Sequence, residues 1–127
     1  RRFHQNYPNY IIKTSLDKES YFSIMNECKF MIGNSSSGIL EAASFNLPVI
    51  NVGDRQKGRV FAKSIINCKI NKKIIQKSLK KIYDKNYQKK LLNLINPYYK
   101  KNTTLNIAKI LKVINLKKIS NKKFVDI

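Results

Sequence analysis

The sequence is poor in the residues that build disulfide frameworks, metal centres and membrane spans. Its 127 residues include no Trp, three Pro, four Gly and two Cys. The cysteines, Cys28 and Cys68, stand far apart without metal-ligand spacing, so we expect reduced thiols in a cytoplasmic protein. No apolar run approaches the roughly 20 residues that span a bilayer, and no signal peptide is visible. These features predict a protein without disulfides, a metal centre or a membrane span.

Acidic residues are also scarce, which leaves a strongly basic chain. Seven Asp and Glu stand against 26 Lys and Arg, for a net charge of +19. The segment 61–127 carries +16 of this charge, from 18 Lys against Asp84 and Asp126. Such a balance suits a polyanionic partner, but only four of the basic residues are Arg, the residue favoured for phosphate and base recognition. We therefore interpret most of the charge as solvated helix faces and regard nucleic-acid binding as unlikely.

Short apolar runs alternate with helical patterns along the chain. This alternation indicates βαβ units, a parallel sheet and right-handed crossovers. The expected fold class is α/β, a Rossmann-like parallel sheet flanked by helices, without an internal domain boundary. Asp17 and Asn71 are expected to cap helices. The patterns predict strands at 10–14, 29–33, 47–52 and 64–70, and helices at 18–28, 36–45, 72–83, from 84 or 86 to 95, and from 102 or 103 to 117.

Three serines and a glycine follow the apolar run 29–33, where a strand is expected to end. Ligands of parallel α/β sheets bind beyond the carboxyl ends of the strands. Ser35, Ser36, Ser37 and Gly38 lead into a predicted helix, whose first amide groups carry a partial positive charge. Small residues let a phosphate approach the backbone, and the hydroxyls add donors. The stretch is a candidate phosphate site.

Glu41 lies about one turn further into the same predicted helix. Its carboxylate could accept hydrogen bonds from both hydroxyls of a ribose, as an acidic residue does in dinucleotide-binding folds. The simpler interpretation is an ordinary strand-to-helix turn with a serine N-cap and a solvated glutamate. Taken alone, the stretch favours this simpler interpretation.

A second polar loop follows the next predicted strand and changes that balance. Residues 53–59 hold two of the four arginines, Arg55 and Arg59, whose guanidinium groups suit the oxygens of a diphosphate. If the strands 29–33 and 47–52 pair, the two loops lie next to each other at one edge of the sheet. A solvated turn is the simpler interpretation here too, yet two anion-suited loops on one edge favour a binding site.

Four motifs carry a family resemblance that spans nearly the whole chain. They are IGNSSSGILEA at 32–42, LPVINVGDRQKGR at 47–59, NPY at 96–98 and KKF at 122–124. With them the chain resembles the C-terminal part of UDP-N-acetylglucosamine 2-epimerases of the hydrolysing type. The non-hydrolysing relatives typically carry a different loop in place of GDRQKGR. The sequence departs from the family after NPY, where a Gly-rich stretch is common.

The resemblance implies a two-domain fold and a set of binding residues. Family members have two Rossmann-like domains facing across a cleft, as in glycosyltransferases of the B type. Residues 1–127 would form a truncated UDP-binding C-terminal domain without the N-terminal domain, and the missing initiator Met is what a fragment would show. Glu41 would bind the ribose, Arg55 would lie near the phosphates, and Phe22 near the uracil, although a core position is slightly favoured for Phe22. The diphosphate would be held by Ser35, Ser36, Ser37 and Gly38.

The resemblance also implies a reaction that needs no cofactor or metal. UDP is eliminated from UDP-N-acetylglucosamine or a close relative, and water adds to the glycal, which gives UDP and a free 2-epimer such as N-acetylmannosamine. In the family, the catalytic acids and bases come mainly from the first domain and the start of the second, which precede this chain, so none is assigned here. The only histidine, His4, has no motif around it and is expected to be exposed. Expected partners are the UDP-sugar, the missing domain or a partner chain, and further copies in a full-length homo-oligomer.

Two other functions remain open from the sequence. A Lys-rich binding module for nucleic acid or anionic surfaces would bind in a strongly salt-dependent way. An inactive remnant would expose apolar surface that normally meets the missing domain.

Overall fold

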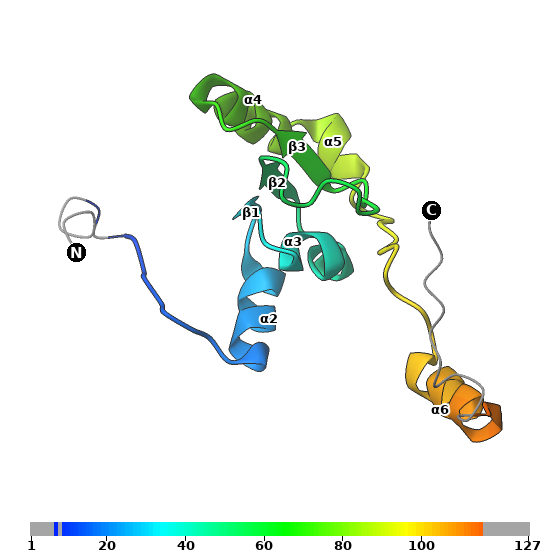
Figure 1. The fold of residues 1–127 in the computed structure, drawn as a ribbon. Coiled ribbons are helices and arrows are strands. Elements are labelled where there is room, and N and C mark those ends of the chain that lie inside the picture. The colour runs from blue at the N-terminus through cyan, green and yellow to red at the C-terminus, as the bar shows by residue number, and fades with distance from the viewer. Residues whose placement is uncertain (1–6, 8, 116–127) are drawn as a thin grey trace.

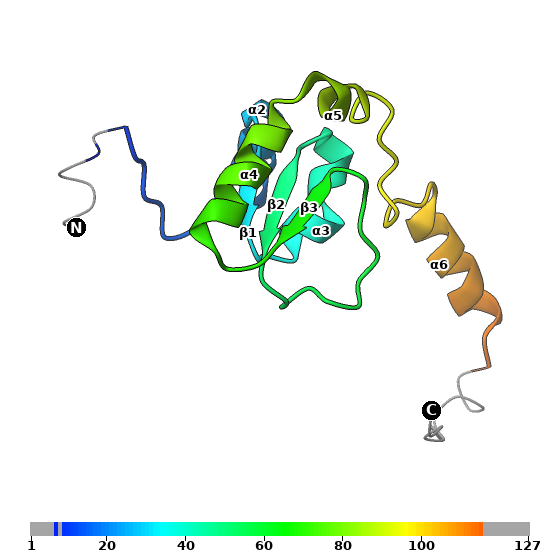
Figure 2. The same ribbon diagram turned by 90° about the horizontal axis from the view of Figure 1, so that it is seen from above.

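The computed structural model describes residue 7 and residues 9–115 of the chain (Figure 1). A three-stranded sheet lies between two sets of helices, and one further helix stands apart (Figure 1 and Figure 2). The predictions for His4, for the motif at 122–124 and for the end of the last helix at 117 lie outside the described residues.

The sheet is parallel, with its strands in the order β1–β2–β3. The strands are β1 (Met31–Gly33), β2 (Val49–Val52) and β3 (Ile65–Cys68). The central strand β2 pairs with β1 on one side and with β3 on the other. The α/β class, the parallel sheet and three of the four predicted strands are confirmed.

The fourth predicted strand, at 10–14, is wrong. This segment has no strand structure, and Ile11 and Ile12 are 81% and 63% exposed. A strand needs the hydrogen bonds of a neighbouring strand. The blue ribbon in Figure 1 shows this segment running away from the sheet, so its apolar residues have no such neighbour.

Helices cover both faces of the sheet. The helix α2 (Lys18–Glu27), the helix α3 (Ser37–Leu40) and the 3-10 helix η1 (Ala42–Phe45) lie on one face. On the other face lie α4 (Lys72–Ile82) and α5 (Lys85–Lys89). Successive side chains of a strand point to opposite faces, so neighbouring residues of β2 enter two different cores.

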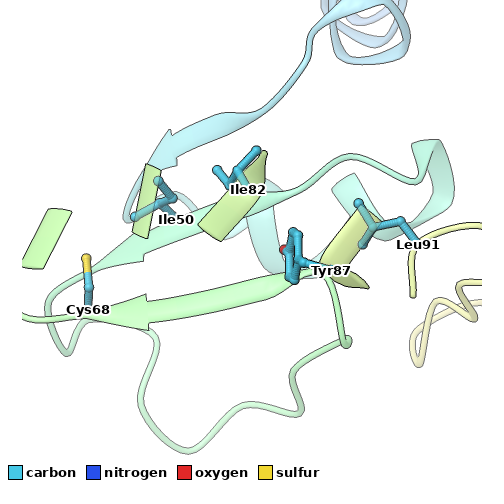
Figure 3. Close-up of a cluster of buried hydrophobic side chains, with 5 residues drawn as sticks. All are labelled: Ile50, Cys68, Ile82, Tyr87 and Leu91. Atoms are coloured by element: carbon cyan, nitrogen blue, oxygen red, sulfur yellow. The ribbon is translucent and has the colours of Figure 1, made fainter. Parts of the chain in front are cut away.

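The two cores are separated by the sheet. Val49 of β2 packs on the α2 side, in a cluster with Met25, Ala42 and Leu47. The next residue, Ile50, is fully buried on the α4 side. Figure 3 shows it in a cluster with Cys68, Ile82, Tyr87 and Leu91.

Both predicted helix caps are confirmed. Asp17 Oδ1 accepts a hydrogen bond from the backbone amide of Ser20 at 2.8 Å, and this bond lowers the pKa of the Asp17 carboxyl. Asn71 Oδ1 accepts from the amides of Lys73 and Ile74 at 3.0 and 3.2 Å. Each cap satisfies amide groups that lack a partner inside the helix, which explains why α2 and α4 begin where the sequence predicts.

The helix predicted over 36–45 is instead two short helices. α3 ends at Leu40 and η1 begins at Ala42, with Glu41 between them at φ −115° and ψ −41°. Asn96 donates from Nδ2 to the Leu40 carbonyl at 2.9 Å, which gives this carbonyl a partner where the α-helix stops. The partner comes from 56 positions along the chain, so no local pattern could indicate the break.

The helix predicted to end near 95 stops at Lys89, and residues 90–93 form turns. Tyr87 and Leu91 reach the core, whereas Leu92 and Ile95 are 75% and 83% exposed. Leu92 and Ile95 therefore bury little surface, and a helix that continued through them would gain little stability from packing.

The last helix, α6 (Thr103–Val113), is close to its predicted position but has no buried residue. Its expected apolar side includes Ile107, Ile110 and Leu111, which are 51%, 57% and 61% exposed. Both ribbon views show α6 apart from the sheet and its helices. Among the described residues, no helix has the length and apolar character needed to cross a membrane.

Tyr87 makes a buried polar contact that ties α5 to the start of β3. Its hydroxyl donates to the carbonyl of Ser64 at 2.7 Å, and the side chain is 6% exposed. Burial raises the pKa of Tyr87 to about 12, from the ordinary value of 10.0. The neutral hydroxyl is thus the form that the fold stabilises.

We expect Tyr87→Phe to lower the free energy of unfolding by ~0.5–1.5 kcal/mol at pH 7.5, because the buried Ser64 carbonyl loses one of its two donors and keeps only the backbone amide of Val49, at 3.0 Å. In the wild type, this contribution is complete below pH 10 and is lost as the pH rises towards about 12, since Tyr87 ionises more readily in the unfolded chain. Phenylalanine does not ionise. Urea unfolding should therefore show the two proteins converging between pH 10 and 12, and a constant difference across that range would contradict the assignment.

Gly38 lets α3 approach the sheet closely. A Cβ at this position would lie 3.0 Å from Val49 Cγ1 and 3.5 Å from Met31 Sδ. The glycine is therefore needed for contact between the first turn of α3 and the strands β1 and β2.

We expect Gly38→Ala to destabilise the fold by ~1–3 kcal/mol through overpacking. The added methyl group collides with one side chain, so Val49→Ala should relieve part of this loss. In a double-mutant cycle measured by urea unfolding, the double variant should lose less stability than the two single losses added together. Strict additivity would show that the contact with Val49 is not what requires the glycine.

Candidate functional site

Two polar loops leave the carboxyl edge of the sheet next to each other. The serine loop, residues 34–37, follows β1, and the arginine loop, residues 53–59, follows β2. β1 and β2 pair in parallel with Gly33 opposite Asn51, so both loops begin at the same edge. The predicted adjacency of the loops is confirmed.

A buried side chain joins the two loops. Gln56 of the arginine loop is 3% exposed, and its Nε2 donates a hydrogen bond to the carbonyl oxygen of Asn34 at 2.8 Å. Sequence reasoning missed Gln56. The available signal was weak, since it consisted of one uncharged side chain between charged neighbours, Arg55 and Lys57.

The three serines of the serine loop are used differently. Ser37 is partly buried, and its Oγ lies 2.7 Å from the hydroxyl oxygen of Tyr21. Ser35 Oγ accepts from the backbone amide of Ser37 at 3.3 Å. Ser36 precedes α3, yet its side chain makes no capping hydrogen bond, unlike in the simpler interpretation of this stretch. Its exposed hydroxyl is thus open to a ligand.

A hollow opens beside the serine loop. Its lining includes Gly33, Asn34, Ser35 and Gly38, at the carboxyl end of β1 and the start of α3. Three apolar side chains of the strands, Met31, Ile32 and Val49, complete the lining, so the hollow combines an apolar floor with the small residues of the serine loop.

The charged candidates come from two places, Glu41 from the end of α3 and Arg55 and Arg59 from the arginine loop. Glu41 is partly buried at the end of α3, and its amide donates to the Ser37 carbonyl at 3.0 Å, one turn from the loop. Arg55 and Arg59 are exposed members of the arginine loop. The structure thus brings the two loops together and holds Glu41 one turn behind the serines.

Phe22 packs among core residues. Its ring is partly buried and lies 5.4 Å from the ring of Phe45, and Lys18 Nζ lies 5.5 Å from its centroid. These contacts fit the core position weighed for Phe22 from the sequence. Contact with a base stays a prediction.

A pair of asparagines extends the polar edge along β2 and β3. Asn51 is 2% exposed and donates from Nδ2 to Asn67 Oδ1 at 2.7 Å. Both line a hollow next to the arginine loop, together with Lys57 and Lys69. Sequence reasoning missed this pair as well, because its members sit inside apolar strands and meet only through the strand register.

The edge as a whole is rich in hydrogen-bond donors. Hydroxyls, loop amides and guanidinium groups suit an oxygen-rich anion. The described residues contain no cluster of three or more His, Cys, Asp or Glu side chains that could hold a metal ion.

Comparison with known proteins gives consistent matches. The family model for UDP-N-acetylglucosamine 2-epimerase matches residues 1–112. A polysialic acid biosynthesis protein P7 from Escherichia coli is 36% identical over 114 residues, which are 89% of this chain and 29% of the relative. A GDP/UDP-N,N'-diacetylbacillosamine 2-epimerase (hydrolyzing) from Campylobacter jejuni is 42% identical over 114 residues, which again are 89% of this chain and 29% of the relative.

A third relative covers a shorter segment. A UDP-N-acetylglucosamine 2-epimerase from Neisseria meningitidis is 43% identical over 58 residues, 46% of this chain and 15% of the relative. This chain therefore spans less than a third of the length of these relatives. The family model nonetheless covers most of its residues, and the chain belongs to the UDP-N-acetylglucosamine 2-epimerase family.

Proposed function

We propose that this chain is the nucleotide-binding part of a hydrolysing UDP-sugar 2-epimerase. It would be the C-terminal Rossmann-like domain of a two-domain protein of the glycosyltransferase B type. The N-terminal domain would come from the rest of the protein or from a partner chain. The observation that supports this most is the adjacency of the serine and arginine loops at the carboxyl edge, in a chain that belongs to this family.

In this proposal, the two loops hold the diphosphate from two sides. Ser35 and Ser36 supply hydroxyls, and neighbouring backbone amides supply further donors. Arg55 lies near the phosphates, at the end of the neighbouring strand. The remaining contacts proposed are Glu41 to the ribose hydroxyls and Phe22 near the uracil.

The loops would assist the reaction by stabilising the leaving group. When the bond between C1 of the sugar and the phosphate oxygen breaks, negative charge grows on the diphosphate. Donors that are fixed in place before this step bind the transition state more strongly than the substrate. The released UDP and a free 2-epimer, such as N-acetylmannosamine, are the proposed products.

UDP affinity tests the proposed site directly. We expect Ser36→Ala to weaken UDP binding by about three- to tenfold, through the loss of one hydrogen bond, and Glu41→Ala to weaken it by about tenfold or more, because its carboxylate is proposed to accept from both ribose hydroxyls. Isothermal titration at moderate salt would measure this, with the exposed Ser23→Ala on α2 as the matched control. Binding that ignores Ser36 and collapses as salt rises would favour the Lys-rich binding module. No UDP binding by the wild-type chain would contradict the proposal.

The chain on its own should not turn over a UDP-sugar, because the catalytic acids and bases are proposed to lie in the other domain. We expect no free 2-epimer by NMR when the chain is incubated with UDP-N-acetylglucosamine. Adding the N-terminal domain of a hydrolysing relative as a separate polypeptide should restore some activity. Release of N-acetylmannosamine by the chain alone would contradict this division of roles.

A further inference from the structure

Gln56 is an amide side chain buried in an otherwise exposed, charged loop. Its neighbours Arg55 and Lys57 are exposed, whereas Gln56 is 3% exposed. Its Nε2 reaches back 22 positions to the Asn34 carbonyl, at 2.8 Å. Among the described residues, this is the one side-chain hydrogen bond between the two loops.

This bond fixes the orientation of the first peptide unit of the serine loop. In a planar trans peptide, the carbonyl and the following N–H point in opposite directions. The described residues contain no cis peptide bond, so the Asn34 carbonyl that faces Gln56 turns the Ser35 N–H away from it. If this peptide unit rotated, a carbonyl oxygen would replace an N–H donor and repel an anion.

Stability does not explain why the position holds an amide. Gln56 Oε1 is buried and has no hydrogen-bond partner among the described residues. A buried polar atom without a partner costs roughly 1–3 kcal/mol. Leucine or methionine would fill the same space without that penalty.

We infer that Gln56 is a positioning residue that makes the serine and arginine loops act on the diphosphate as one unit. The inference rests on the proposed function and adds a residue that does not itself touch the ligand. Gln56 holds the peptide unit between Asn34 and Ser35 in its donor-presenting orientation. The same bond anchors the loop that carries Arg55.

The first test replaces the amide by apolar side chains of similar size. We expect Gln56→Leu and Gln56→Met to bind UDP about tenfold more weakly in isothermal titration, with melting temperatures equal to or above that of the wild type. Two variants are used so that a folding defect in one leaves the other to decide. Gln76→Leu, on the exposed surface of α4, is the matched control and should bind UDP as the wild type does.

The second test distinguishes positioning from simple structural support. Arg55→Ala is measured in the wild type and in the Gln56→Leu background. If Gln56 acts by holding the arginine loop against the serine loop, Arg55→Ala should weaken UDP binding clearly in the wild type and less than twofold in that background. Independent effects, in which the two losses multiply, would overturn the inference.

The outcomes separate this inference from the function on which it rests. If the wild type binds UDP and both Gln56 variants bind it equally well, the positioning role is wrong and the proposed function stands. If the wild type does not bind UDP, both fail. Weaker binding in the Gln56 variants together with a non-additive cycle supports the inference.

Discussion

The parallel pairing of β1 with β2 is the constraint on which the candidate site depends. It brings the ends of two strands, and therefore two loops that are far apart in the sequence, to the same edge. α3 lies close to these two strands, which requires a residue without a side chain at position 38. The polar groups of the site are thus held by apolar packing beneath them, where Val49 and Ile50 are 2% and 0% exposed.

The Asn-Pro-Tyr motif at 96–98 contacts the end of α3 and the 3-10 helix η1. Asn96 donates from one amide nitrogen to the Leu40 carbonyl and to Ser44 Oγ, at 2.9 and 2.7 Å. Its Oδ1 accepts from the backbone amide of Tyr98, which holds the turn of the motif. The buried Asn96 side chain therefore gives the last carbonyl of α3 a hydrogen-bond donor and holds residues 96–98 against the end of that helix. The motif acts here through two backbone groups and the Ser44 hydroxyl, and these contacts account for its asparagine without a ligand.

Sequence patterns predicted the parts of the fold whose causes are local. The caps at Asp17 and Asn71, the three core strands and the placement of both loops follow from short-range chemistry and from the rule that parallel strands end at one edge. The parts that were missed depend on contacts between distant residues. The break after Leu40 needs Asn96, and the burial of Gln56 needs the Asn34 carbonyl. The residues around Leu40 and around Gln56 in the sequence do not indicate which distant residue each will contact.

Only part of the large positive charge of the chain lies at this edge, where Arg55, Lys57 and Arg59 belong to the arginine loop and Lys69 lines the hollow beside it. One cluster of lysines, Lys63, Lys81, Lys89 and Lys90, lines a hollow near Ile65, at the amino end of β3. Because the strands are parallel, this cluster lies at the end of the sheet opposite to the two loops. At physiological salt, interactions between exposed charges are largely screened beyond ~8 Å. These lysines can draw anions towards the molecule, whereas the proposed contacts to a diphosphate are the hydroxyls, amides and guanidinium groups of the loops. For this reason, salt should weaken binding to the lysine surface far more than binding to the loops, although the same chain carries both.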